Sequence, residues 1–309
     1  MWDTAYEIRI LGYRVRSHAS SLTTQGAGFW LIPGSIFSVV HKKLSAIKPL
    51  TLSLVIPVYN EESYLKACLD SVATQTIKPL QVIVVDNNST DKTASIAQKF
   101  PFVTLLRESR QSQVFAEATG FDAVTADIIG RLDADTILPP DWVSKVLARF
   151  TQNNALAAIS GSPRPYDVTG HLQIAIKAFQ LYHNYGSSFI AGHQLLWGSN
   201  AAFKQSLWPK VKNSLHYRAD IWEDYDLSFA LAKYGYILWD KDLSVGCSFR
   251  LFEQPTLRQL RYHLRAVRTF WLNTSWWRSA AHALLRSSLV FSIIFAKVAR
   301  FIDRLFNDQ

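Results

Sequence analysis

The stretch Leu52-Ser-Leu-Val-Ile-Pro-Val-Tyr59 is a continuous, mostly apolar run, and it is followed at once by the polar residues Asn60-Glu-Glu62. Its length and its valine and isoleucine content favour a buried strand over a segment of helix. The clearest boundary in the chain, at Lys48 and Pro49, lies just before it. We therefore predict that this stretch is the first strand of the main folded domain.

The same pattern recurs along the next 80 residues or so, with short apolar runs separated by segments of helical character. Strands alternating with helices of this length predict a parallel sheet with crossover helices on both faces. The fold class we expect is α/β, with a mostly parallel, Rossmann-like sheet. The predicted strands are 52–59, 81–85, 103–106 and 127–132, and the predicted helices are 60–69, 92–99 and 113–124.

Three of the predicted strands end in polar clusters, which are Tyr59-Asn-Glu61, Asp86-Asn-Asn88 and Asp133-Ala-Asp135. In parallel sheets, ligands bind just beyond the carboxyl ends of the strands. The coincidence of these clusters predicts one ligand-binding edge.

Asp133 and Asp135 form an Asp-x-Asp pair whose joint charge requires a counter-ion. Oxygen-only ligation suits Mg²⁺ or Mn²⁺, which use one or two carboxylates and complete their shell with water and phosphate oxygens. Acidic strand-to-loop turns are also common without a metal. For Asp86 the alternatives are recognition of a base and capping of the next turn, and for Tyr59 they are stacking on a base and packing in the core.

Five longer motifs of this chain resemble motifs of one known protein family. Leu54-Val-Ile-Pro-Val-Tyr-Asn-Glu-Glu62, Val84-Val-Asp-Asn-Asn-Ser-Thr-Asp91 and Leu132-Asp-Ala-Asp-Thr136 resemble the opening, the nucleotide-binding segment and the metal motif of glycosyltransferase family 2. Gly198-Ser-Asn-Ala-Ala-Phe-Lys204 is similar to its acceptor-side motif, and Trp222-Glu-Asp-Tyr-Asp-Leu227 to its Glu-Asp element. The resemblance covers residues 50 to about 270.

This resemblance implies a GT-A fold, a nucleotide-diphosphate sugar donor, a divalent metal and inversion at the anomeric carbon. Asp224, beside Glu223, is implied as the catalytic base, and Asp133 and Asp135 as the groups that handle diphosphate and metal. The acceptor side is expected at Gly198, Asn200 and Trp222, and the contacts to the nucleoside at Pro57, Tyr59, Glu61 and Asp86.

The chemistry of the residues agrees with the implied role of Asp224. A single in-line displacement needs a base opposite the leaving diphosphate, and a carboxylate beside an apolar wall can have its pKa raised to a useful value. We expect Trp222 and Tyr225 to form that wall. The alternative for Glu223 and Asp224 is an acidic pair stabilised by a helix N-terminus.

Two departures from the family pattern stand out. Glu117 takes a position where a basic or amide residue is usual. Arg258-Gln-Leu-Arg-Tyr262 resembles the Gln/Arg-x-x-Arg-Trp element of membrane-associated members, with Tyr262 in place of Trp. By this match Arg261 contacts the diphosphate, and the alternative is a solvated helix face.

The net charge of +9 is concentrated at the two ends of the chain. Residues 1–48 hold six basic and two acidic side chains, residues 250–305 hold ten and two, and residues 49–249 are close to neutral. Basic ends are attracted to anionic lipid or nucleic acid. Because no nucleic-acid-binding module accompanies the charge, we expect no nucleic acid partner.

Residues 278–304 predict a basic stripe on an otherwise apolar helix, with Trp271, Trp276 and Trp277 just upstream. Its uncharged centre, 287–296, is too short to cross a bilayer, as is the apolar run 27–40. We expect peripheral or monotopic attachment at the cytoplasmic face of a membrane, and the alternative is a helix packed on the catalytic domain or on a second copy. The stripe is formed by Arg278, His282, Arg286, Lys297, Arg300 and Arg304.

Two cysteines, Cys68 and Cys247, indicate neither a disulfide framework nor a zinc site, and the N-terminus lacks the pattern of a signal peptide. The expected domains are a basic extension (1–48), a GT-A catalytic domain (49–250) and a basic amphipathic helical region (251–309).

The function we expect is sugar transfer to a lipid-linked or membrane-associated acceptor in the synthesis of a cell-envelope glycan or glycolipid. One alternative is a polyprenyl-phosphate sugar synthase, and another is a membrane-bound scaffold without turnover.

Overall fold

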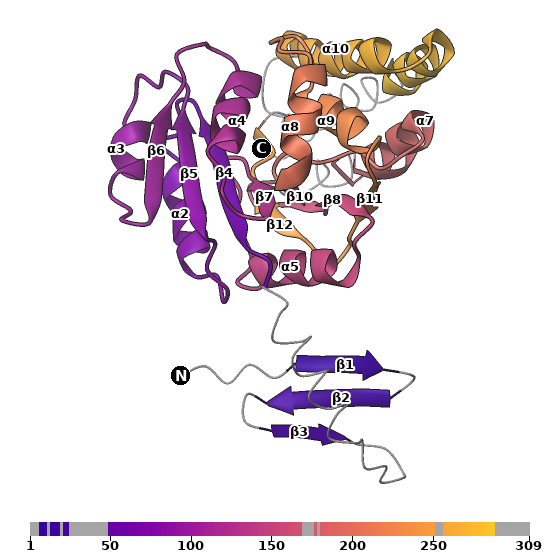
Figure 1. The fold of residues 1–309 in the computed structure, drawn as a ribbon. Helices are drawn as coiled ribbons and strands as arrows, with labels where there is room; N and C mark the ends of the chain where they lie inside the picture. Colours follow the sequence, from indigo (N-terminus) through magenta and orange to yellow (C-terminus); the bar gives the residue numbers. More distant parts are fainter. Residues whose placement is uncertain are drawn as a thin grey trace, which may run out of the picture. The chain divides into compact units, whose positions relative to one another are not determined.

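The computed structural model describes residues 6–10, 13–18, 21–24, 49–168, 176–177, 180–250 and 256–287. The chain divides into two compact units, Met1–Pro49 and Leu50–Gln309. In the first unit, β1 (Tyr6–Ile10), β2 (Tyr13–His18) and β3 (Ser21–Thr24) pair as an antiparallel sheet (Figure 1). The apolar run 27–40 lies outside the described residues.

The second unit is built on a seven-stranded sheet, counted over the residues that the structure describes, in the order β11-β8-β10-β7-β4-β5-β6 (Figure 1). Strand β10 runs antiparallel to its neighbours β7 and β8, and the other pairs are parallel. The α/β, mostly parallel fold class is thereby confirmed. The strands are β4 (Leu52–Val58), β5 (Gln81–Asp86), β6 (Val103–Arg107), β7 (Ile128–Arg131), β8 (Leu156–Ser160), β10 (Ala201–Lys204) and β11 (Tyr236–Trp239).

The helices of this unit are mostly short, and β9 (Pro163–Pro165) with β12 (Val245–Cys247) forms a separate two-stranded sheet. A π-helix spans Tyr182–Ser187, and 3₁₀ turns span Gln205–Leu207 and Lys212–Ser214. A further α-helix spans residues 276–287. The labelled α-helices are α2 (Leu65–Ala73), α3 (Thr93–Ala97), α4 (Gln113–Asp122), α5 (Trp142–Gln152), α7 (Ser188–Ala191), α8 (Trp208–Val211), α9 (Glu223–Leu231) and α10 (Thr256–Asn273).

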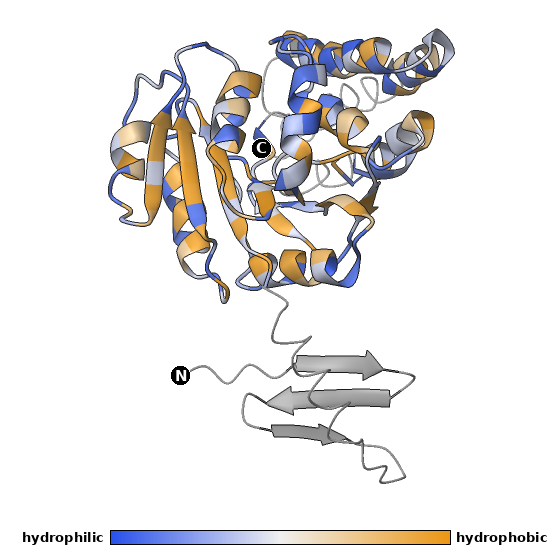
Figure 2. Cartoon of the chain, in the orientation of Figure 1, coloured by the Kyte–Doolittle hydropathy of each residue, from blue (hydrophilic) through white to orange (hydrophobic). Residues whose placement is uncertain are grey.

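The sheet is apolar on both faces because side chains alternate along each strand. In β4, Leu54 and Ile56 point to the layer that contains α2 and α5, whereas Val55 points to the layer that contains α4, α8 and α9. The hydrophobic colouring of the central strands and the mixed colouring of the helices reflect this two-sided burial (Figure 2). Burial on both faces explains why the strands are continuous apolar runs in the sequence.

The helix predicted over 60–69 begins later than expected, at Leu65. Asn60 has a left-handed backbone with φ 54°, which asparagine tolerates better than most residues. Its side chain accepts a 2.8 Å hydrogen bond from the Thr90 amide, and the Glu61 amide donates to the Thr93 hydroxyl at 2.7 Å. Residues 60–62 therefore bind the loop after β5 instead of starting a helix.

A third apolar cluster joins α9 to α10 and holds the described C-terminal residues on this unit. Trp222, Tyr225 and Phe229 pack there with Ala266 and Phe270. Among the residues that the structure describes, no helix combines the length and the apolar composition required to cross a bilayer.

The basic stripe predicted over 278–304 is wrong at two of its described positions, because His282 and Arg286 are buried. Arg286 donates to His263 Nδ1 at 2.8 Å and to the Tyr225 hydroxyl at 2.9 Å, and its guanidinium lies 4.3 Å from the centre of the Trp222 ring. Aromatic rings and hydrogen bonds replace water around this cation, so it points inward. Lys297, Arg300 and Arg304 lie outside the described residues.

Candidate active site

A cleft of about 620 Å³ opens at the carboxyl ends of β4 and β7 and is closed on its far side by α9 and α10. This is the edge where a parallel sheet binds its ligands. Nine of the predicted site residues line it, and they come from four separate segments of the chain. They are Pro57, Tyr59, Glu61, Asp133, Asp135, Gly198, Trp222, Glu223 and Asp224.

The first group in the cleft consists of carboxylates around Arg250. The guanidinium of Arg250 lies 2.5 Å from Glu61 Oε1 and 3.6 Å from Asp135 Oδ2, and it stacks on the Tyr64 ring at 4.3 Å. Burial and the nearby charge of Asp133 raise the pKa of Asp135 to about 7. One cation therefore only partly offsets the negative charge of this group.

The carboxylates fit a divalent cation. Glu61 Oε2 is buried and has no hydrogen-bond partner among the described residues. Burial raises the pKa of Glu61, and repulsion by Asp133 adds to the effect. Within the described part of the chain, no three or more His, Cys, Asp or Glu side chains are grouped to hold a metal by themselves. Mg²⁺ or Mn²⁺ needs only one or two carboxylates when phosphate oxygens complete its shell, so Asp133 and Asp135 suffice.

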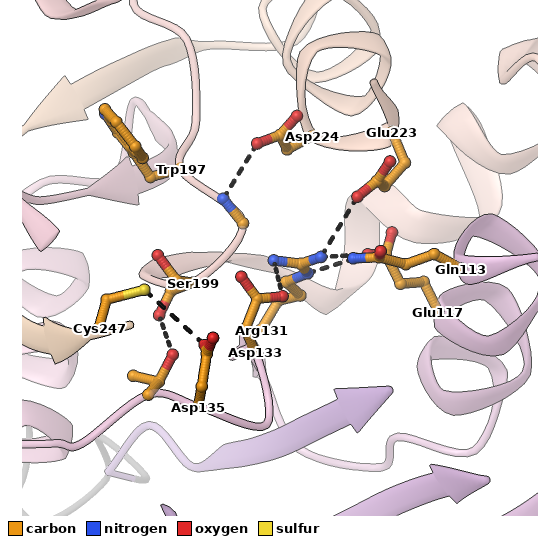
Figure 3. Close-up of polar contacts among 12 residues, drawn as sticks. Gln113, Glu117, Arg131, Asp133, Asp135, Trp197, Ser199, Glu223, Asp224 and Cys247 are labelled. Atoms are coloured by element: carbon orange, nitrogen blue, oxygen red, sulfur yellow. Dashed lines mark hydrogen bonds and ion pairs between the residues drawn. The ribbon is translucent and has the colours of Figure 1, made fainter. Parts of the chain in front are cut away.

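Arg131, at the end of β7, is a buried cation that connects the two sides of the cleft. Its guanidinium lies 2.7 Å from Glu117, 2.9 Å from Asp133 and 3.5 Å from Glu223 (Figure 3). These carboxylates hold the pKa of Arg131 well above its usual value. Glu117, which departs from the family pattern, is thus the counter-ion of a buried arginine.

Glu223 and Asp224 occupy the first turn of α9, on the side of Arg131 opposite to Asp133 and Asp135 (Figure 3). Asp224 accepts hydrogen bonds from the amides of Gly198 at 3.1 Å and Tyr225 at 2.9 Å. Burial raises the pKa of Glu223 and of Asp224 to about 7, and the charge of Glu223 adds to the effect at Asp224. A carboxylate with this pKa can take a proton near neutral pH.

Gly198 permits the close approach between Arg131 and the loop before β10. A Cβ atom at this position would lie 1.8 Å from Arg131 Nη1. The guanidinium cannot move aside without leaving its three carboxylates, so no larger residue fits here while the ion-pair network persists.

The apolar wall beside Asp224 differs in part from the expectation. Trp222 lines the cleft, but its partner in the wall is Tyr262 of α10, whose ring centre lies 4.5 Å away. Tyr225 is fully buried and is not part of the cleft surface. Its hydroxyl accepts a hydrogen bond from Arg286. Tyr262 is the residue that replaces the tryptophan of the family element.

Three predicted site residues lie outside the cleft lining. Asp86 accepts a hydrogen bond from the Ser89 amide at 3.1 Å, so it caps the following turn, as in the second of the two alternatives for this residue. Asn200 is fully buried, where it accepts from Trp142 Nε1 at 2.8 Å and donates to the Leu243 carbonyl at 2.6 Å. Arg261 is exposed on α10.

Other cleft residues were not predicted, and their sequence signals differ in strength. Arg131 interrupts an apolar strand run, which is an available sign of a special role. Arg258 opens the Arg258-Gln-Leu-Arg-Tyr262 element and also lines the cleft, whereas no local pattern distinguishes Arg250 and Arg265 from other arginines near the C-terminus.

Solved structures with a similar fold include a mannosyltransferase. The mannosyltransferase PcManGT from Pyrobaculum calidifontis, in complex with GDP-Man and Mn²⁺, superposes with a TM-score of 0.59 at 20% identity over 85% of this chain and 81% of that one. S. aureus TarS in complex with UDP-GlcNAc superposes with a TM-score of 0.51 at 16% identity, over 70% of this chain and 67% of that one. The fold is therefore of the GT-A type.

Sequence relatives point to one family. Chondroitin synthase of Escherichia coli is 32% identical over 43% of this chain and 21% of its own length. An undecaprenyl-phosphate 4-deoxy-4-formamido-L-arabinose transferase of Serratia proteamaculans is 32% identical over 34% of this chain and 35% of its own length. The chain spans between 13% and 21% of the first three curated relatives. Glycosyl transferase family 2 matches residues 53–212, more than half of the chain, and the chain belongs to this family.

Proposed function

We propose that this glycosyltransferase moves a sugar, with inversion, from a nucleotide-diphosphate sugar to a lipid-linked or membrane-associated acceptor in the synthesis of a cell-envelope glycan or glycolipid. The observation that carries the proposal is that Asp224 lines the same cleft as Asp133 and Asp135, from the opposite side. An inverting displacement needs a base opposite the leaving group, and this arrangement supplies one.

The donor would lie against the strand ends, with its nucleoside beside Pro57, Tyr59 and Glu61. Tyr59 is 49% exposed at the cleft, which supports stacking on a base and does not fit the alternative of ordinary core packing. Structural neighbours of this chain bind GDP-Man and UDP-GlcNAc, which supports a nucleotide-diphosphate sugar as donor class.

The diphosphate would lie toward Asp133, Asp135 and Arg250. A Mn²⁺ or Mg²⁺ ion held by the two aspartates would offset charge on the departing diphosphate. Arg250 contributes a second positive charge to the same region.

Asp224 would accept the proton of the acceptor hydroxyl as the hydroxyl oxygen attacks the anomeric carbon. The Gly198 and Tyr225 amides hold its carboxylate in place. Trp222 and Tyr262 cover this side of the cleft and exclude water, which limits hydrolysis of the donor. Glu223 keeps Arg131 in the network and raises the pKa of the base.

A polyprenyl-phosphate sugar synthase is the second candidate. Arg258 and Arg265 line the cleft on the α10 side, and one relative is an undecaprenyl-phosphate transferase. A phosphate acceptor would be attracted by these arginines and would need little deprotonation.

Turnover of Asp224→Asn distinguishes the two candidates. With a hydroxyl acceptor, we expect the rate to fall by about 10²–10⁴-fold, because a general base is lost. With a polyprenyl-phosphate acceptor, we expect a mild change. The measurement is release of nucleotide diphosphate from UDP- and GDP-sugars with Mn²⁺ or with EDTA, for both acceptor types.

The control for folding is the thermal shift that a nucleotide diphosphate with Mn²⁺ produces in the wild type and in the variant. Metal-independent release, or an Asp224→Asn variant as active as the wild type on a hydroxyl acceptor, would contradict the proposed mechanism.

We also propose that the protein acts at the cytoplasmic face of a membrane, as a peripheral or monotopic enzyme. The excess of basic side chains at both ends of the chain supports attraction to anionic lipid. In this proposal, residues 49–250 form the catalytic domain and residues 251–309 provide the membrane-facing region.

A further inference from the structure

Helix α10 carries an apolar stripe on its exposed side, which we define as Leu257, Leu260, Leu264, Val267 and Trp271. The spacing of three and four residues places these side chains on one face of the helix. Leu257, Leu264 and Trp271 are 61%, 56% and 64% exposed. An exposed apolar face of this kind marks an interaction site.

Another face of α10 packs against the rest of the unit. Gln259, His263, Ala266 and Phe270 are buried against the rest of the unit. The apolar stripe is therefore additional to the face that attaches the helix to the fold.

A row of arginines runs beside the apolar stripe. At 100° per residue, Arg258, Arg261, Arg265 and Arg268 lie on the side of the stripe that leads to the cleft. Residues 256–273 contain no acidic side chain. Arg268 pairs with Asp220 of a neighbouring loop, whereas Arg261 and Arg265 are exposed.

The charge on α10 selects between possible occupants of the stripe. A second copy of this helix would bring arginines against arginines with no carboxylate on either helix, and such like-charge contacts oppose association. An anionic lipid surface provides phosphate for the arginines and an apolar boundary for the leucines and the tryptophan.

We propose that α10 docks on an anionic lipid bilayer, with its apolar stripe in the boundary between headgroups and acyl chains and its arginine row against lipid phosphate. The surface thus differs from the 278–304 stripe expected from the sequence. The docking deepens the membrane location that we proposed for residues 251–309, and it rests on the proposed sugar transfer only in what it implies for the acceptor.

Docking in this way would place one border of the cleft at the level of the headgroups. Arg258, Tyr262 and Arg265 line the cleft from the side of α10 next to the stripe. A lipid-linked acceptor could then present its head to Asp224 and Trp222 without leaving the bilayer.

The test is co-sedimentation of the full chain with vesicles of phosphatidylglycerol and phosphatidylcholine, and with vesicles of phosphatidylcholine only. We expect binding to the anionic vesicles that weakens as salt is added. Replacing Leu257, Leu264 and Trp271 together by serine should abolish it, since each lost leucine weakens partition about tenfold. Arg261→Gln should weaken it about fivefold.

The matched control is the double variant Ile77→Ser and Leu80→Ser. These side chains are 46% and 57% exposed and lie just before β5, at the sheet edge opposite to the cleft. We expect this variant to bind vesicles like the wild type. Loss of binding in the control to the same extent would overturn the proposal, because the effect would then not be specific to α10.

Two further outcomes would overturn it. One is a wild type that binds neither kind of vesicle, and the other is a dimer, detected by light scattering, that the triple serine variant dissociates. The thermal shift with nucleotide diphosphate and Mn²⁺ reports on the cleft independently. A protein that fails on vesicles but keeps this shift contradicts the docking and the proposed membrane location but not the proposed sugar transfer, and the reverse result contradicts only the sugar transfer.

Discussion

Asp224 is the residue whose surroundings decide the chemistry of the cleft. Burial and, after it, the charge of Glu223 raise its pKa to about 7, while Arg131 acts in the opposite direction. A base works only when deprotonated, so activity should increase as pH rises through the pKa. If Asp224 is the base, as we propose, the neighbouring carboxylate sets the pH range in which the enzyme works.

The pH profile of Glu223→Gln tests this assignment. Removing the negative charge should lower the pKa of Asp224, so the acidic limb of the profile of kcat/KM should move to lower pH. Glu61→Gln is the matched control, because it neutralises a carboxylate whose charge is not among the causes of the raised pKa of Asp224. An unchanged acidic limb in Glu223→Gln would show that another group is the base.

At the scale of elements, the helix at 276–287 supports α9 through one buried cation. Arg286 contacts Tyr225 of α9 and His263 of α10, and it lies over the ring of Trp222. The pKa of His263 is lowered to about 3 by burial and by the charge of Arg286, so His263 accepts this hydrogen bond as a neutral ring. Three segments beside Trp222, on the side of the cleft where we propose that the acceptor binds, therefore meet at a single guanidinium.

We expect Arg286→Met to lower the free energy of unfolding by about 2–4 kcal/mol, because it leaves buried polar groups without their partner. Arg278→Met is the control on the same helix. Arg278 donates to the Ala191 carbonyl at 3.1 Å and is only partly buried, so its loss should cost about 1 kcal/mol or less. Urea unfolding of both variants measures the difference, and equal costs would contradict a special role for Arg286.

On the scale of the whole molecule, the cleft gathers acidic side chains whose charge the fold only partly neutralises. Asp135, Glu223 and Asp224 each have a pKa raised to about 7, so the folded state holds protons that the unfolded state releases near pH 4. Stability should therefore fall as pH rises from about 5 to about 7. A metal ion with a nucleotide diphosphate should reverse part of this loss, because metal ligands bind when deprotonated.

The melting temperature measured from about pH 5 to about pH 8, with EDTA or with Mn²⁺ and a nucleotide diphosphate, tests the prediction. In EDTA the melting temperature should decrease as pH rises, and the increase in melting temperature that Mn²⁺ and nucleotide produce should become larger as pH rises. Asp224→Asn should flatten the slope in EDTA. A melting temperature that rises over this range in EDTA would mean that the three carboxylates are not protonated near neutral pH.

Much of the fold and part of the site could be predicted from the sequence. Strands such as Gln81–Asp86 are continuous apolar runs because both faces of the sheet are covered, and the topology then brings their polar ends to one edge. The start of α2 was missed because the residues after Tyr59 form hydrogen bonds with the loop after β5, which no local pattern reveals.

The sequence by itself determined the α/β sheet, the acidic pair at the end of β7 and the acidic start of α9, because each depends on neighbours within a few residues. Only the tertiary structure decided that Glu117 neutralises Arg131, that Tyr262 completes the wall at Trp222 and that Arg286 points inward. These contacts join residues far apart in the chain. Their charges and rings become partners only when packing excludes water between them.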